Sequence, residues 1–277
     1  MSHRYDAMFA RAEAQGETAL GGFLMLGDPN PEHCERLIDA LVEGGVDMLE
    51  LGIPFSDPVA DGPEIQAAAK RALDAGFRPA DAFHLIARIR ERHPDIPIGL
   101  LTYANLLAAR GVVRFCEDLA AAGADSLLVA DLPTLEASDY AGVCKQAGLA
   151  PVMIAAPNSS DAQLDRIAEM GAGYTYCVAR AGVTGQRERL ALDHDPLFAA
   201  LRERNAAPPV LGFGISTPDH VRQAASSGAA GVISGSALVA AARSENGVEA
   251  VRELAQQLKK GARANAPREG VAEANLV

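Results

Sequence analysis

Short apolar runs alternate along the chain with longer segments in which apolar residues recur at helical spacing. Most of the runs lack the polar alternation of a half-exposed strand, which is typical of parallel strands covered on both faces. Strands are therefore expected at residues 23–26, 46–53, 96–103, 126–131, 151–156, 174–179, 210–215 and 231–236. Helices are expected at residues 31–43, 79–92, 111–122, 135–147, 161–170, 196–205, 218–227 and 247–260, with one more at 4–14 ahead of the first strand.

Glycine residues stand between many of the expected helices and the next apolar run, as at Gly45, Gly123 and Gly228. A glycine just past a helix readily takes the left-handed conformation that turns the chain back toward a strand. Eight alternating units predict an α/β fold, a closed (β/α)8 TIM barrel with an extra N-terminal helix; an open doubly wound sheet is the alternative. We expect residues 1–262 to form this single domain and the polar residues 263–277 to be a flexible C-terminal tail.

Length and charge limit the kinds of partner that the chain can have. A chain of 277 residues with 49% hydrophobic residues can bury one large core, and barrels of this class commonly run to about 250 residues. The net charge of -11 disfavours nucleic acid and anionic membranes as general partners. The sequence shows no apolar stretch of about 18 residues and no leader-like segment, so a cytoplasmic location is predicted.

The cysteines and histidines lack the spacing of a metal site or of a disulfide framework. The four cysteines lie far apart in apolar or helical segments, so reduced and packed thiols are expected. These are Cys34, Cys116, Cys144 and Cys177. The histidines are expected on the surface or in helices: His33, His84, His93, His194 and His220, with His3 near the start. The sequence therefore predicts no metal site.

Two carboxylates stand out near the end of the second expected strand. Glu50 lies inside an apolar segment, where loss of solvent would raise its pKa toward the range useful for proton transfer. Asp61 follows eleven residues later in a turn-rich loop, where it is expected to stay more solvated and more readily ionised. Carboxylates with separated pKa values are a recognised acid and base arrangement. The alternative is a buried glutamate neutralised by an arginine and an aspartate that caps a turn.

The last two expected strands end in glycine and serine residues, at the end of a barrel where active sites lie. The segments are GFGIS at 212–216 and SGSA at 234–237. Glycine lets backbone N–H groups approach a dianion, and a helix beginning near Ser236 would add its positive end. Together the two segments predict a phosphate site built from main-chain groups, whereas close packing could explain either glycine segment alone.

Two connections at the same end of the barrel are longer than a minimal one, at residues 54–78 and 180–195. Long connections at the catalytic face often serve as lids or partner surfaces. The second contains GVTGQR at 182–187, whose glycines permit movement. We therefore expect a mobile lid there; an ordinary surface loop is the alternative.

Several segments together resemble one known family. They are LELGIPFSDPVADGPEIQ at 49–66, LGDP at 26–29, IPIGLLTYANL at 96–106, RAGVTG at 180–185, GFGIS at 212–216 and SGSA at 234–237. The chain is similar to the tryptophan synthase alpha chain, in register from about residue 4 to residue 260. The resemblance implies a lyase of tryptophan biosynthesis that cleaves indole-3-glycerol phosphate to indole and glyceraldehyde 3-phosphate. It also implies an α2β2 tetramer with a beta chain that carries pyridoxal phosphate, and no cofactor in this chain.

The resemblance also implies roles for individual residues. Glu50 falls on the family's acid/base glutamate, and Asp61 falls on the aspartate that faces the indole nitrogen. The implied substrate contacts are Phe23 in the indole pocket, Tyr176 near the glutamate, Thr184 in the lid, and Gly185, Phe213, Gly214, Gly235 and Ser236. The implied contacts with the beta chain are Pro54, Ser56, Asp57 and Pro58.

Three positions depart from the family pattern. Gly22 and Met25 stand where many members have proline and threonine, and Glu64 replaces a small or β-branched residue. None of them removes a catalytic group, so the departures bear on pocket packing and loop stiffness. The alternative functions are another phosphate-binding barrel enzyme, such as a phosphosugar isomerase, and a non-catalytic activating subunit. The presence of both carboxylates argues against each alternative.

Overall fold

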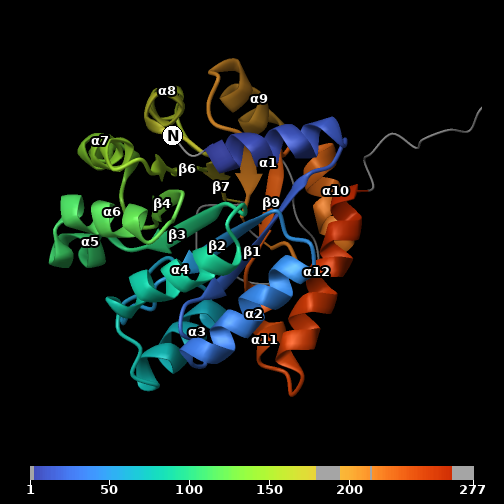
Figure 1. Ribbon diagram of the computed structural model, residues 1–277. Coiled ribbons are helices and arrows are strands. Elements are labelled where there is room, and N and C mark those ends of the chain that lie inside the picture. The colour runs from blue at the N-terminus through green and yellow to red at the C-terminus, as the bar shows by residue number, and fades with distance from the viewer. Residues whose placement is uncertain (1–2, 179–193, 213, 264–277) are drawn as a thin grey trace, which may run out of the picture.

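Nine short parallel strands follow one another around a nearly closed barrel, and helices cover its outside (Figure 1). The structure is a computed structural model that describes residues 3–178, 194–212 and 214–263. The strands are β1 Ala19–Met25, β2 Met48–Gly52, β3 Ile98–Thr102, β4 Ser126–Val129, β5 Ala150–Pro151, β6 Met153–Ala155, β7 Thr175–Cys177, β8 Pro209–Leu211 and β9 Gly231–Ser234. The neighbours run β5-β4-β3-β2-β1-β9-β8-β7-β6, which confirms the expected barrel.

The barrel closes through its fifth strand position, where one predicted strand is divided into β5 and β6. Only Val152 separates the two pieces, and its N–H donates to Leu127 O at 3.0 Å. β5 pairs with β4, and β6 pairs with β7. One extended segment thus bonds to a neighbour on each side, and the nine strands occupy the eight expected positions.

The helices follow the expected order with several additions. They are α1 His3–Ala14, α2 Pro31–Glu43, α3 Pro63–Asp74, α4 Asp81–Arg92, α5 Ala104–Arg110, α6 Val112–Ala121, α7 Ser138–Gln146, α8 Asp161–Met170, α9 Asp195–Glu203, α10 Pro218–Ser226, α11 Ser236–Ala242 and α12 Gly247–Arg263, with the 3-10 helix η1 Thr134–Glu136. Among these described helices, none is long and apolar enough to cross a membrane. The predicted tail at 263–277 lies outside the described residues except for Arg263.

Helix α3 corrects the expectation of a long irregular connection at residues 54–78. Pro63 stands at its start, where a missing N–H costs nothing. Ile65, Ala68, Ala69 and Ala72 are buried at helical spacing. The irregular part after β2 is therefore the short loop at residues 53–62 that carries Asp61.

Two aspartates pin neighbouring strands at the N-terminal end of the barrel. Asp47 precedes β2 and accepts from Leu20 N in β1 at 2.9 Å, while Asp125 precedes β4 and accepts from Ile98 N in β3 at 2.8 Å. Lys259 of α12 bonds Asp47 at 2.7 Å. Each buried carboxylate thus fixes the start of a strand and is neutralised by a cation from a helix.

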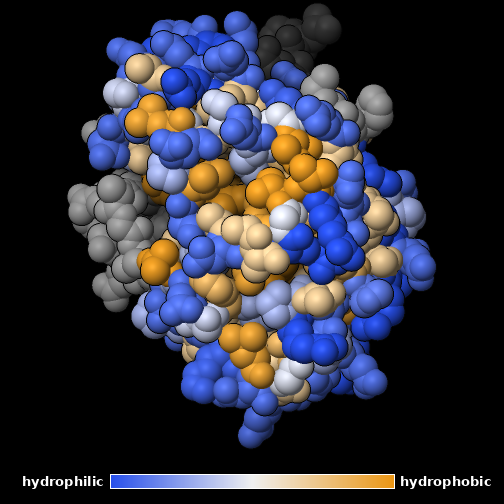
Figure 2. All heavy atoms as spheres, turned by 90° about the vertical axis from the view of Figure 1, so that its left-hand side faces the viewer, coloured by the Kyte–Doolittle hydropathy of each residue, from blue (hydrophilic) through white to orange (hydrophobic). Residues whose placement is uncertain are grey.

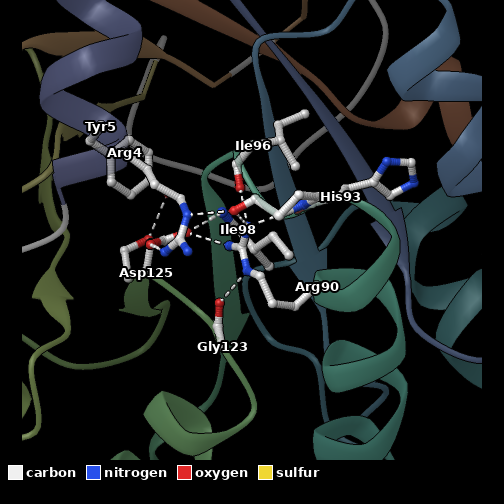
Figure 3. A network of polar contacts seen from close by, with 10 residues as sticks. Arg4, Tyr5, Arg90, His93, Ile96, Ile98, Gly123 and Asp125 are labelled. Carbon is white, nitrogen blue, oxygen red and sulfur yellow. Dashed lines mark hydrogen bonds and ion pairs between the residues drawn. The ribbon is translucent and has the colours of Figure 1, made fainter.

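The cations around Asp125 also hold the extra N-terminal helix in place (Figure 3). Arg90 of α4 reaches Asp125 at 2.6 Å, and Arg4 of α1 reaches it at 2.9 Å. Arg4 also donates to Pro94 O at 2.8 Å. Helix α1 is therefore fastened across the N-terminal end of the barrel.

Helix α1 also sends Tyr5 into the barrel. Tyr5 is almost fully buried, and its hydroxyl lies 2.9 Å from Ser126 Oγ. Gly99 of β3 provides the space: a Cβ there would lie 2.7 Å from Ser126 Oγ and 2.9 Å from Tyr5 Oη. The Tyr5 ring packs on Tyr174, with ring centroids 5.4 Å apart. The added helix thus completes the floor of the barrel interior.

We expect Gly99→Ala to destabilise the fold by about 1–3 kcal/mol, because the new methyl group overlaps two buried hydroxyls and forces a local shift. Gly142→Ala is the matched control, since no atom lies within 4 Å of a Cβ at this position in α7. A helical glycine replaced by alanine should gain up to about 1 kcal/mol. Urea unfolding of both variants would measure this, and equal stability of the two would contradict the packing argument.

Candidate active site

A pocket of about 200 Å³ opens at the C-terminal ends of the strands. Residues from both halves of the barrel form its wall: Phe23, Glu50, Ala60, Asp61, Ile65, Leu101, Leu128, Ala130, Ile154, Tyr176, Val178, Gly212, Gly214, Ile215, Ser216, Ile233, Gly235, Ser236 and Ala237. The wall is mostly apolar, with two carboxylates toward one side and glycine and serine toward another. Such a pocket suits a ligand that has a flat apolar part and a polar end.

Strand register places Glu50 inside the barrel. Glu50 in β2 pairs with Phe23 in β1 and with Gly99 in β3. Only 2% of Glu50 is exposed, and Tyr174 donates its hydroxyl to Glu50 Oε1 at 2.8 Å. Burial raises the pKa of Glu50 to about 7, the Tyr174 hydrogen bond opposes this, and the charge of Asp61 adds to it. Near neutral pH both the acid and the carboxylate are therefore present.

Asp61 is buried, which corrects the expectation of a solvated loop aspartate. Only 8% of the residue is exposed, and burial raises its pKa to about 6. A hydrogen bond with Tyr103 opposes this rise. The expected order of the two pKa values is retained, because the pKa of Asp61 lies below that of Glu50.

Tyr103, at the end of β3, supports the loop that carries Asp61. Its hydroxyl accepts from Ala60 N at 3.3 Å, and its ring packs against Phe55 with centroids 5.3 Å apart. Gln66 in α3 donates to Asp61 O at 2.8 Å. Sequence reasoning missed Tyr103 although it lies within the TYANL segment, because the contact joins residues 43 positions apart.

Two tyrosines of the β7 region have separate roles. Tyr176 lines the pocket as expected, and the charges of Glu50 and Asp61 contribute to its raised pKa, which places it near both. Its hydroxyl, however, donates to Gly212 O at 2.8 Å, and Tyr174 makes the bond to Glu50. Sequence reasoning missed Tyr174; the period of two that puts both tyrosines on one strand face was the available signal.

Another part of the pocket wall combines two backbone segments. Gly214, Ile215 and Ser216 follow β8, and Gly235 and Ser236 follow β9. Gly214 has a φ of +73°, which favours glycine. A Cβ on Gly235 would lie 3.7 Å from the Phe23 side chain, an ordinary contact. Internal packing therefore does not demand this glycine, whereas close approach of a ligand to its backbone would.

Three expected substrate contacts, Thr184, Gly185 and Phe213, lie outside the described residues. The structure brings the other expected contacts together in one pocket. Within the described part of the chain, no three His, Cys, Asp or Glu side chains gather as a metal-binding group. The absence of a metal in the working protein stays a prediction.

The expected partner surface needs one correction. Pro54 is buried, whereas Ser56 and Asp57 are exposed and Pro58 is partly exposed. Val59 beside them is 69% exposed. Exposed apolar side chains also occur at Val113 and Leu135, in α6 and η1. Figure 2 looks onto the side that carries α5, α6 and α7, and apolar residues gather near the middle of this face.

The thiols agree with expectation: all four cysteines are free and buried. The histidines were expected on the surface or in helices. His220 lies in α10 as expected and is buried there, whereas His194 is buried just before α9. His194 Nε2 lies 3.2 Å from Val178 O, and His220 Nδ1 lies 3.3 Å from Ser216 N. Both histidines thus contact residues of the pocket wall.

Comparison with protein-family models gives one match, described as tryptophan synthase alpha chain, over residues 9–265. The chain is 51% identical to the tryptophan synthase alpha chain of an Escherichia coli strain over 236 residues, covering 85% of this chain and 88% of the relative. The alpha chain of Vibrio vulnificus is 49% identical over the same shares of the two chains.

Solved structures show the same similarity. A Mycobacterium tuberculosis tryptophan synthase structure matches with a TM-score of 0.85 and 32% identity, covering 94% of this chain and 98% of the other. Tryptophan synthase subunit alpha of Legionella pneumophila matches with a TM-score of 0.82 and 32% identity over the same shares. Sequence and fold thus indicate one family along nearly all of the barrel.

The hydrogen bond to Glu50 can be tested by titration. Tyr174→Phe removes the donor that lowers the Glu50 pKa, so we expect this pKa to rise above about 7 and the side chain to stay protonated to higher pH. Carbon-13 NMR of glutamate-labelled protein would follow the carboxyl, assigned by the loss of its signal in Glu50→Gln. Tyr176→Phe is the control, because its hydroxyl bonds Gly212 O. Equal shifts in the two variants would argue against a specific bond.

Proposed function

The chain belongs to the tryptophan synthase alpha chain family, and we propose that Glu50 and Asp61 are the two groups that carry its reaction. The chain is thus the lyase subunit of tryptophan biosynthesis that cleaves indole-3-glycerol phosphate to indole and glyceraldehyde 3-phosphate. The observation that supports the residue roles is the pair of buried carboxylates on one apolar pocket, with pKa values raised to about 7 and about 6.

Bond cleavage requires a proton on C3 of the indole ring. Protonation there turns the ring into a cation whose charge lies on nitrogen, and this cation can accept the electrons of the bond to the side chain. The proton on the adjacent side-chain hydroxyl must then leave, so that its oxygen forms the aldehyde while the bonding electrons restore the indole. With a pKa of about 7, Glu50 can give the first proton as an acid and take the second as a base.

Asp61 supports the cation. An ionised carboxylate placed against the ring N–H stabilises the positive charge that appears after protonation of C3. The pKa of Asp61 is about 6, so the group is mostly ionised near neutral pH while much of Glu50 is still protonated. Since the pocket wall is largely apolar, the attraction acts with little screening by water.

The phosphate is proposed to bind at the glycine and serine side of the pocket. Gly214, Gly235 and Ser236 offer backbone amides there, and Phe23 stands beside Gly235 as a surface for the indole ring. Thr184, Gly185 and Phe213 complete the proposed set of substrate contacts. Main-chain donors would let a chain with a net charge of -11 hold an anionic substrate.

Partner, cofactor and location belong to the same proposal. The family's chain works with a beta chain, and we propose an α2β2 tetramer in the cytoplasm. Glu50 supplies the proton transfers described above and Asp61 supplies the stabilising charge, so no cofactor is proposed for this chain, and pyridoxal phosphate is expected in the beta chain. The proposed docking surface comprises Ser56, Asp57, Pro58 and Val59, without the buried Pro54.

Replacement of either carboxylate should abolish most of the activity. We expect Glu50→Gln and Asp61→Asn each to lower the cleavage rate by at least about a hundredfold, because one loses the acid and base and the other loses the charge on the ring nitrogen. Release of glyceraldehyde 3-phosphate from indole-3-glycerol phosphate measures the rate. Asp74→Asn, at an exposed position of α3, is the control and should match the parent.

Circular dichroism and thermal unfolding would establish that each variant is folded. Near-normal turnover by a folded Glu50→Gln or Asp61→Asn protein would reject the role assigned to that residue. Absence of cleavage by the parent, alone and with a beta chain, would instead favour a non-catalytic subunit.

The docking surface leads to a second test. A beta chain that orders the loop at residues 53–62 would fix Asp61, and a population shift of about 2–3 kcal/mol would raise the rate roughly 30- to 150-fold. We expect Asp57→Ala to weaken this activation far more than the basal rate, since Asp57 is exposed and outside the pocket. Steady-state and stopped-flow assays with and without the beta chain measure both. Equal loss of basal and activated rates would assign the loop to catalysis alone.

A further inference from the structure

The turn after β8 forms one half of the proposed phosphate site, and side chains outside the substrate-binding set hold it. Gly214, Ile215 and Ser216 line the pocket. Gly214 is in the left-handed region, so the shape of this turn does not follow from a regular strand or helix. Its backbone needs other contacts to keep its amides directed at a ligand. The structure shows two such contacts, from Ser234 and from His220.

Ser234 joins the two halves of the site. It is the last residue of β9 and is fully buried, and its hydroxyl donates to Ile215 O at 2.7 Å. The next two residues, Gly235 and Ser236, form the other half of the proposed phosphate site. One hydrogen bond therefore sets the distance between the turn after β8 and the turn after β9.

His220 holds the far end of the same turn. It lies in the first turn of α10, with 7% of the residue exposed, and its Nδ1 is 3.3 Å from both Ser216 N and Ser216 Oγ. A backbone N–H can only donate, so Nδ1 must carry a lone pair and the ring proton resides on Nε2. Thr217 Oγ1 accepts from His220 N at 3.3 Å, which fixes the backbone that carries the ring.

We infer that Ser234 and His220 are positioning residues for phosphate binding: they hold the 214–216 turn against the 235–236 segment so that the backbone amides of both face one anion. The inference rests on the proposed function, which puts the phosphate at these segments. Neither side chain is among the residues that line the pocket. Both act through the backbone, and their loss should affect the phosphate end of the substrate rather than the indole end.

Binding of glycerol 3-phosphate and of indole tests the phosphate end and the indole end of the substrate site separately. We expect Ser234→Ala and His220→Leu each to raise the Kd for glycerol 3-phosphate about three- to tenfold, as for loss of one hydrogen bond. The Kd for indole should stay within about twofold of the parent in both variants. His220→Gln should largely restore phosphate binding, because its amide oxygen can accept from Ser216 N. Isothermal titration calorimetry of the full chain measures all of these constants.

Kinetics provide a second readout. KM for indole-3-glycerol phosphate should rise with the glycerol phosphate Kd, while kcat changes less than about twofold because Glu50 and Asp61 are untouched. His84→Leu, at an exposed position of α4, is the control and should bind both fragments like the parent. Equal weakening of indole and glycerol phosphate binding would mean a general structural role and would overturn the inference.

Gly235→Val tests the proposed phosphate site separately from the positioning role of Ser234 and His220. A side chain there would enter the pocket and should block the phosphate. If Gly235→Val binds glycerol 3-phosphate like the parent, the proposed phosphate site itself is wrong. If Gly235→Val loses binding while Ser234→Ala and His220→Leu retain it, only the positioning role is wrong. If His220→Leu fails to fold, Ser234→Ala and His220→Gln decide.

Discussion

The burial of the Glu50 carboxyl inside a parallel barrel is the constraint on which the rest of the site depends. Its pKa rises from 4.5 to about 7 because the folded chain removes water from it. Between these pH values the unfolded chain releases the proton while the folded chain keeps it, so folding stability falls as pH rises through this window and levels off above about 7. The loss is on the order of a few kcal/mol. The same burial supplies an acid and base near neutral pH.

The floor of the barrel explains how this carboxyl is kept in one place. Tyr174 bonds Glu50, the Tyr174 ring packs on Tyr5, and Tyr5 reaches Ser126 through the space left by Gly99. The helix that carries Tyr5 is fastened to the barrel by the ion pair between Arg4 and the buried Asp125 (Figure 3). An added N-terminal helix is therefore part of the support of the site. Its removal would take away the Tyr5 ring that packs on Tyr174.

The sequence pattern predicted the structural features that follow from local periodicity, and it missed those that depend on single hydrogen bonds and tertiary contacts. The eight strand positions, most helices and the burial of Glu50 follow from apolar runs and from helical spacing of apolar residues. Burial of Asp61 could not be predicted, because Tyr103, which covers its loop, is distant in sequence, and the bond from Gln66 depends on helix α3, which the pattern did not predict. Tyr174 was missed because its hydrogen bond to Glu50 crosses the barrel. His220 was missed although its contact with Ser216 is local, because a single hydrogen bond within a turn leaves no periodic pattern in the sequence. Helix α3 was not predicted because most of its buried residues are alanines, which give only a weak periodic pattern of hydrophobicity.

The two carboxylates are held by different kinds of structure, and this difference determines where a partner can act. Glu50 lies within β2, between two paired strands, and moves only if the sheet moves. Asp61 lies in a loop with an exposed outer side, and a 3.3 Å contact from Ala60 N to Tyr103 ties this loop to β3. A protein that binds the outer side of the loop can therefore change the placement of Asp61 without disturbing Glu50. Proton transfer would stay intact, and the partner would control the charge that faces the ring nitrogen.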